Sequence, residues 1–214
     1  MTLENEIFRL LNITLLYDNI NPQSVMSDKI RTDLATVVGS EHSPIVTLIP
    51  QMLIVAYPTL QVTATIDNRR LGVNDGSQKK IGERPLTAVA SKIYEIIGKD
   101  EIVAYGFNYA LDYTNKGKRS LDEYFYENFV PKSIQKKFPE ILISTSPRLH
   151  FKINGVSYDL RLEPDFLMEK PERIRIHLNI HYKKNGKIKL PKIEELDKQF
   201  NEGFKWLKKQ LVIL

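Results

Sequence analysis

The sequence predicts an α+β fold, a mostly antiparallel sheet with helices packed on one side. Residues 148–182 have the pattern of three consecutive strands, and Asn154-Gly155 between alternating apolar residues is the strongest hairpin signal in the chain. The order strand, helix, strands, helix also occurs twice, over residues 6–98 and 101–214. We therefore expect two similar halves, residues 1–98 and 99–214, packed as one compact unit.

The N-terminal half begins with an apolar run over residues 6–17, which predicts a largely buried strand. Asn21-Pro22 supplies an N-cap and a proline at the first helical position, and Gly39 ends the helix that follows. Short apolar or alternating runs then predict four strands, over residues 45–49, 53–56, 60–67 and 71–73. An exposed loop over residues 74–80 and a helix over residues 84–98 complete this half.

The C-terminal half opens with a strand over residues 102–113 that has aromatic residues on one face. Its other face carries Ala104, Gly106 and Ala110, where we expect a helix to pack closely. Ser120 to Glu123 forms a capping box, and Pro131 separates the helix that it begins from a shorter one over residues 132–138. Pro191 begins the last helix, in which apolar residues recur at three- and four-residue steps.

The Asn154-Gly155 turn also predicts the register of the three strands. With Ile153 opposite Val156, His150 lies opposite Asp159, and Arg148 lies opposite Arg161. Side chains alternate between the two faces of a strand, so one face of this unit is apolar and the other is polar. The residues that we expect to bind a ligand on the polar face are Arg148, His150, Lys152, Asp159, Arg161, Arg173, Arg175 and His177.

An arginine and histidine face suits an anion such as phosphate, because the guanidinium is a planar fork of donors that always stays charged. The same residues also fit a solvated face with cross-strand ion pairs. His177 and His181 lie about 13 Å apart at ~3.3 Å per residue, too far to share one metal ion, so no metal site is predicted. Acid–base chemistry by His150 with Asp159 is a further alternative.

Arg69 and Arg70 follow a predicted turn at Asp67-Asn68 and form a second candidate binding site, for a phosphate or an acidic partner. Carboxylates at Asp67 and Asp75 supply too few ligands for a divalent cation. Plain turn chemistry explains the same residues, since Asn, Asp and Gly favour turn positions.

Composition restricts the function classes. The chain has no cysteine, which excludes disulfides and thiolate metal sites and fits a reducing compartment, so we expect a cytoplasmic location. No stretch approaches the roughly 18 apolar residues of a membrane span, and the N-terminus has no apolar run typical of a signal peptide. The net charge of +5 permits nucleic acid as a partner but does not require it.

These observations favour a non-enzymatic binding or assembly protein, an adaptor or a subunit of a protein complex. Ten tyrosines, nine phenylalanines and the apolar residues 211–214 offer anchors for a protein partner or for self-association. The alternative is a nucleic-acid or phosphate binder that uses the polar sheet face, and a second alternative is a nuclease or hydrolase. We expect no cofactor, because the chain has no Walker loop, G-x-S-x-G elbow, dinucleotide fingerprint or HExxH helix.

Overall fold

A computed structural model of the chain describes residues 2–25, 27–98, 101–137, 146–165 and 172–213. The predicted α+β fold is confirmed. Nine strands form one sheet in the order β2-β3-β4-β5-β1-β6-β9-β8-β7, and neighbouring strands are antiparallel throughout. The strands are β1 (Leu3–Leu16), β2 (Ile45–Ile49), β3 (Met52–Tyr57), β4 (Val62–Asp67), β5 (Arg70–Asp75), β6 (Ala104–Asn115), β7 (Arg148–Ile153), β8 (Val156–Pro164) and β9 (Arg173–Tyr182).

Both parts of the chain contribute to this one sheet. In each part, the first strand lies beside the last strand of the meander that follows it, β1 beside β5 and β6 beside β9. The two first strands pair with each other at the centre, where Asn12 lies opposite Asn108. Within the described ranges, β2 and β7 are therefore the two edges of the sheet. The division into halves 1–98 and 99–214 stays a prediction.

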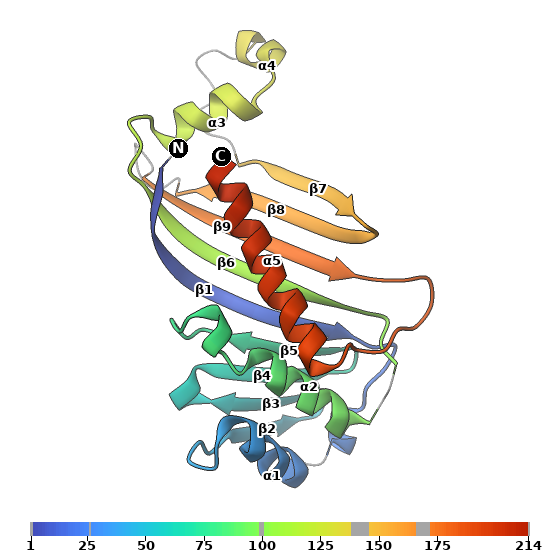
Figure 1. Ribbon diagram of the computed structural model, residues 1–214. Helices are drawn as coiled ribbons and strands as arrows, with labels where there is room; N and C mark the ends of the chain where they lie inside the picture. Colours follow the sequence, from blue (N-terminus) through green and yellow to red (C-terminus); the bar gives the residue numbers. More distant parts are fainter. Residues whose placement is uncertain (1, 26, 99–100, 138–145, 166–171, 214) are drawn as a thin grey trace.

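Three helices cover one face of the sheet, α1 (Ser27–Val38), α2 (Leu86–Ile97) and α5 (Ile193–Ile213) (Figure 1). The core lies between them and the inward side chains of the strands. Gly203 lets α5 approach closely, because a Cβ at this position would lie 2.6 Å from both Ile180 Cδ1 and Tyr109 Oη. The Tyr109 hydroxyl donates to the Phe200 carbonyl at 2.6 Å, which fastens the helix to β6.

The small-residue face of β6 does not receive a helix, so that prediction was wrong. The helices pack on the opposite, tyrosine-bearing face of β6. Gly106 is small for another reason, since a Cβ there would lie 2.7 Å from the Ile180 carbonyl oxygen in the neighbouring strand β9. Among the described elements, no helix lies over the face of the sheet opposite α1, α2 and α5 (Figure 1).

The helices begin and end at the predicted capping residues, except that the first helix begins later than expected. Asn21 caps a short 3-10 turn over Pro22–Ser24, and α1 begins later, at Ser27. Gly98 ends α2 at a φ of 68°. The capping box of Ser120 and Glu123 is present at the start of α3 (Leu121–Phe129), and α4 (Lys132–Lys137) follows Pro131. Residue 138, expected in that helix, lies outside the described residues. No helix in the described part of the chain combines the length and the apolar character that a membrane crossing needs.

Two expectations about burial were wrong. The first part of β1 is not buried, since Ile7 and Leu10 are exposed. The expected loop over residues 74–80 is partly internal, because Asp75 extends β5 and its carboxylate points into the core. There it forms an ion pair of 2.9 Å with Arg84, and both side chains are fully buried.

Candidate binding face

We call the face of the sheet opposite α1, α2 and α5 the open face. It is polar from β5 to β7, whereas at β2 and β3 it carries Ile45, Ile49 and Ile54. The register predicted from the Asn154-Gly155 turn is present here: Ile153 lies opposite Val156, and His150 lies opposite Asp159. The third strand pairs alongside, so that Arg161 lies opposite His177. The predicted residues of β7, β8 and β9 therefore share the open face.

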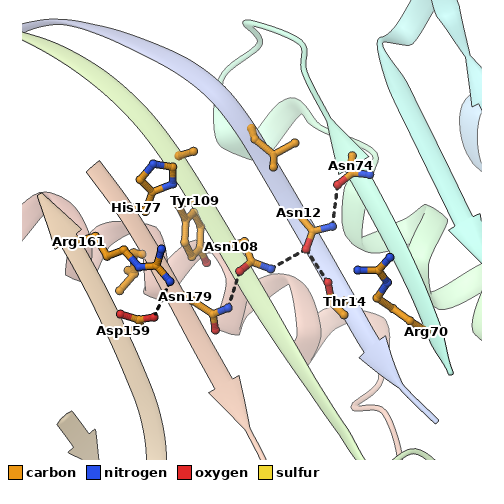
Figure 2. A pocket seen from close by; sticks show the side chains of 13 residues that line it. Asn12, Thr14, Arg70, Asn74, Asn108, Tyr109, Asp159, Arg161, His177 and Asn179 are labelled. Carbon is orange, nitrogen blue, oxygen red and sulfur yellow. Dashed lines mark hydrogen bonds and ion pairs between the residues drawn. The ribbon is translucent and has the colours of Figure 1, made fainter. Parts of the chain in front are cut away.

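Four asparagines form a row across the middle of this face, and we call it the amide row (Figure 2). Asn74, Asn12, Asn108 and Asn179 lie opposite one another on the adjacent strands β5, β1, β6 and β9. The Nδ2 group of Asn179 donates to Asn108 Oδ1 at 2.6 Å, that of Asn108 to Asn12 Oδ1 at 2.6 Å, and that of Asn12 to Asn74 Oδ1 at 2.8 Å. The amides consequently all point in one direction.

Asn12 fixes that direction. Its nitrogen also donates to the Val73 carbonyl at 3.2 Å, and its oxygen also accepts from the Thr14 hydroxyl at 2.7 Å. All four hydrogen-bonding positions of this amide are thus used. A backbone carbonyl can only accept, so the Asn12 amide cannot be flipped without losing bonds. Asn108 uses one N–H and one lone pair within the row and keeps one of each for a ligand.

A depression of about 390 Å³ lies over the amide row. Arg161 and His177 line it on the β8 and β9 side, and Arg70 lines it on the β5 side (Figure 2). Its donors and acceptors come from neighbouring strands of one sheet, which holds them in fixed positions.

Asp159 is the centre of a first ion-pair cluster. Its carboxylate accepts from Arg148 Nε at 3.0 Å and Nη2 at 2.8 Å, and Arg161 Nη2 lies 3.4 Å away. His150 Nε2 lies 3.4 Å from the same carboxylate. The hydrogen bonds from Arg148 lower the pKa of Asp159 against the opposing effect of burial, and Arg161 and His150 lower it further. The acid thus relieves the repulsion between the two facing arginines.

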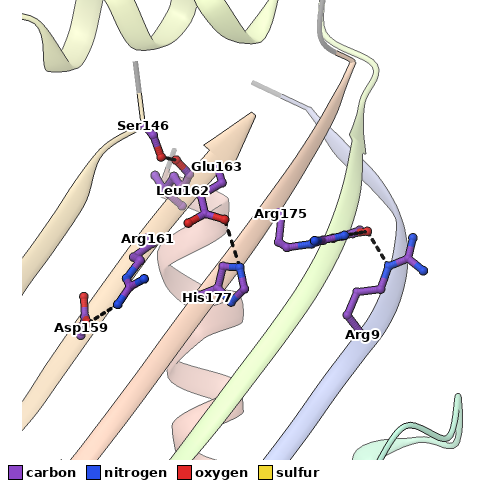
Figure 3. Close-up of polar contacts among 9 residues, drawn as sticks. Arg9, Ser146, Asp159, Arg161, Leu162, Glu163, Arg175 and His177 are labelled. Atoms are coloured by element: carbon purple, nitrogen blue, oxygen red, sulfur yellow. Dashed lines mark hydrogen bonds and ion pairs between the residues drawn. The ribbon is translucent and has the colours of Figure 1, made fainter. Parts of the chain in front are cut away.

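Asp112 lies on β6, between β1 and β9, and is the centre of a second cluster. Figure 3 shows its two arginines, Arg9 and Arg175. Arg175 donates to it from Nε at 2.8 Å and from Nη2 at 3.1 Å, and Arg9 Nε donates at 2.5 Å. Burial disfavours the charged carboxylate, but the hydrogen bonds from Arg175 and Arg9 outweigh it and lower the pKa of Asp112. Arg9, Asp112 and Arg175 line a second depression of about 590 Å³, and Arg173 lines it as well.

The two clusters have the same stoichiometry, two arginines around one carboxylate. Between them, His177 Nε2 lies 3.2 Å from Glu163 (Figure 3). Each guanidinium has five N–H donors, and the bonds within a cluster use one or two of them per arginine. The Asp159 cluster therefore keeps a net positive charge and donors for an incoming anion. The Asp112 cluster keeps free donors, but Glu163 and Asp165 also act on Arg175 and balance the charge of its arginines.

The two arginines of the second predicted site, Arg69 and Arg70, lie in different surroundings. Arg70 lines the depression over the amide row, with its Nε 3.2 Å from Asp67. Arg69 lies exposed in the turn, where its backbone N–H donates to Asp67 Oδ1 at 2.9 Å, and it does not line that depression. Asp75 points to the other side of the sheet and pairs with Arg84, so it does not act with Asp67. Lys152 lies exposed on β7, on the same face as Arg148.

Sequence reasoning did not identify the amide row, Arg9 or Asp112 as parts of the site. Asparagine is depleted in strands, so Asn12 and Asn108 in the middle of long strands were a usable signal. Their alignment depends on the β1–β6 register, which joins residues 96 positions apart. No local turn fixes that register, so the row could not be assembled from the sequence.

The geometry can be compared with two other chemistries, metal binding and acid–base catalysis. In the described part of the chain, no three His, Asp or Glu side chains lie close enough together to hold a metal ion. His150 and Asp159 are neighbours as predicted, but Arg148 and Arg161 also engage the carboxylate. Models of known protein families give no match to the sequence, and a search of curated proteins gives none either.

Proposed function

We propose that this protein is a binding protein, an adaptor or complex subunit, whose open face docks an extended acidic segment of a protein partner. The observation that carries the proposal is the amide row with arginines on both sides of it. Arg70 lies on the β5 side, and the Asp159 cluster lies on the β8 side.

The arginines supply the attraction for carboxylates. A guanidinium binds a carboxylate through two parallel hydrogen bonds, which adds direction to the charge attraction. The Asp112 cluster shows this geometry within the chain, where Arg175 binds one carboxylate through two nitrogens. A carboxylate of a partner would find the same kind of donors on the surplus arginines.

The amide row supplies the complement of a peptide backbone. Asn108 keeps one N–H donor and one oxygen lone pair. A peptide group has one C=O that can accept from the first and one N–H that can donate to the second. Because Asn12 holds the row in a single orientation, a partner meets groups that need no rearrangement. The row therefore suits an extended chain laid across the strands.

The positions of the aromatic residues favour a peptide over a single-stranded nucleic acid. Proteins that bind single strands usually stack the bases on exposed aromatic rings. On the described strands of the C-terminal part, the aromatic side chains lie on the helix side: Tyr109 contacts Phe200 of α5, and Phe151 and Tyr158 contact Trp206 of α5. The open face of these described strands presents guanidinium and imidazole groups but no phenyl, phenol or indole ring.

A titration with labelled poly-glutamate at two salt concentrations tests the proposal. We expect the wild type to bind, with an affinity that falls as salt rises. The double variant Arg173→Gln/Arg175→Gln should lose most of that binding. It should remain folded, since Arg9 still pairs with the buried Asp112 carboxylate when Arg175 is replaced.

The matched control is Lys132→Gln/Lys136→Gln, which removes the same charge from exposed positions on α4. It should bind like the wild type. Equal, weak retention of the wild type and the Arg173/Arg175 variant would contradict the proposal. RNA, DNA and heparin serve as parallel probes, and tighter binding to RNA or DNA than to poly-glutamate would overturn the choice of a protein partner.

A further inference from the structure

The two edges of the sheet differ sharply in chemistry. The edge strand β2 has the sequence Ile45-Val46-Thr47-Leu48-Ile49 and contains no charge. Ile45 is 59% exposed, Leu48 48% and Ile49 45%, the highest values among the exposed large hydrophobic residues of the described chain. Within the described residues, β2 pairs with β3 alone. Its outer side thus presents unpaired backbone groups beside apolar side chains.

The other edge is protected. Strand β7 carries Arg148, His150 and Lys152 at alternating positions, and charges of this kind discourage edge-to-edge pairing. Strand β2 carries no charged residue along its length. A free, apolar edge in one chain is a pairing surface for another strand.

We propose that β2 pairs with β2 of a second copy of this chain, antiparallel and centred on Thr47. This register places Ile45 opposite Ile49 of the partner copy and Val46 opposite Leu48. It opposes apolar residues to apolar residues over the full strand, with no like charges in contact. The inference does not depend on the proposed function of the open face.

A second copy fits better than an unlimited array. The antiparallel β2–β2 contact is isologous, so it closes once two copies have joined. Pairing of β2 with β7 of another copy would be heterologous and would extend without limit, and the three basic residues of β7 oppose it. The chain already joins two strands in this antiparallel way at its centre, where β1 meets β6.

One side chain reaches the β2 edge at its hairpin end. Gln23 Nε2 donates to the carbonyls of Ile49 and Pro50 at 3.2 Å and 3.4 Å. Gln23 is exposed, and it contacts β2 only through the carbonyl of its last residue. We therefore expect Gln23→Ala to leave the dimer intact.

The absence of cysteine permits a register-specific test. Thr47→Cys places one thiol on each side of the two-fold axis, at a Cα separation of about 4.5–5.5 Å that suits a disulfide. A mild oxidant should therefore cross-link Thr47→Cys into a dimer. Leu48→Cys faces Val46 of the other copy and should not cross-link with itself. A mixture of Ile45→Cys and Ile49→Cys should cross-link, whereas each alone should not.

Sedimentation of the full chain provides a second readout. The wild type should be dimeric, and Thr47→Lys, which places a charge at the centre of the edge, should be monomeric. Ser133→Lys adds the same charge on α4 and should stay dimeric, and circular dichroism confirms that both variants are folded. A monomeric wild type, a dimer unchanged by Thr47→Lys, or equal cross-linking of Thr47→Cys and Leu48→Cys would each overturn the inference.

Discussion

At the scale of single residues, Asn12 is the key to the open face. Its replacement by alanine removes four hydrogen bonds and leaves the Val73 carbonyl and the neighbouring amides without their partner. We expect a loss of about 1–3 kcal/mol, because unsatisfied buried polar groups cost this much. Urea denaturation should show a lower midpoint with an unchanged slope.

Asn179→Ala is the matched control. Asn179 is exposed at the end of the row and makes one side-chain bond, to Asn108. Its removal should change the unfolding free energy by at most about 0.5 kcal/mol. Equal costs for the two variants would mean that the amide row is not organised by Asn12.

The buried pair of Asp75 and Arg84 gives a second prediction at this scale. Arg84→Met would leave the Asp75 carboxylate in the core without its counter-charge, and we expect a cost of about 3–5 kcal/mol. The double variant Asp75→Leu/Arg84→Met removes both charges and should be more stable than Arg84→Met alone. Thermal unfolding of the two proteins shows which is more stable. A lower midpoint for the double variant than for Arg84→Met would contradict the prediction.

At the scale of single elements, the β7–β8 hairpin depends on its turn. Asn154 and Gly155 have positive φ values of 50° and 80°. A β-branched residue resists such a conformation, so Gly155→Val should destabilise the protein by about 1–3 kcal/mol. Gly82 is a suitable control, because its surroundings are open and its φ is not in the positive range. A thermal midpoint that Gly155→Val leaves unchanged would be incompatible with this turn.

Helix α5 is an integral part of the core. Leu196, Phe200 and Leu207 are buried in it, and Trp206 packs on Phe151 and Tyr158. Burial of one large apolar side chain is worth about 1.5–3 kcal/mol, so removal of this set approaches the whole stability of a typical domain. A chain that ends before Pro191 should therefore fail to fold. A soluble 1–190 fragment with cooperative unfolding would refute this.

Sequence reasoning succeeded where local signals decide the structure. The Asn154-Gly155 turn determined the register of β7 and β8, and the capping box located the start of α3. It failed where contacts between residues distant in the sequence decide the structure. The small residues of β6 did not show which of its sides faces the helices. Gly106 is required because a side chain there would clash with the Ile180 carbonyl of β9. The burial of Asp75 likewise depends on Arg84, nine residues away in sequence.

At the scale of the whole molecule, the two faces of one sheet differ in chemistry. Its helix side holds the apolar core, and its open face collects arginines, histidines and the amide row from strands of both parts of the chain. Arg9 and Arg175 come from opposite ends of the sequence and meet at Asp112. The arrangement of residues on the open face therefore exists only when the complete sheet has formed.

The opposite effects of two substitutions in the Asp112 cluster test the proposed function most directly. Asp112→Asn releases Arg9 and Arg175 from their shared carboxylate, whereas Arg175→Gln removes a cation. Poly-glutamate should bind more tightly to Asp112→Asn and more weakly to Arg175→Gln, each by up to about fivefold for ~1 kcal/mol. Circular dichroism and thermal unfolding should show that both variants are folded. If the two variants bind equally, or both bind like the wild type, the open face is a structural surface and not a docking site for an acidic segment.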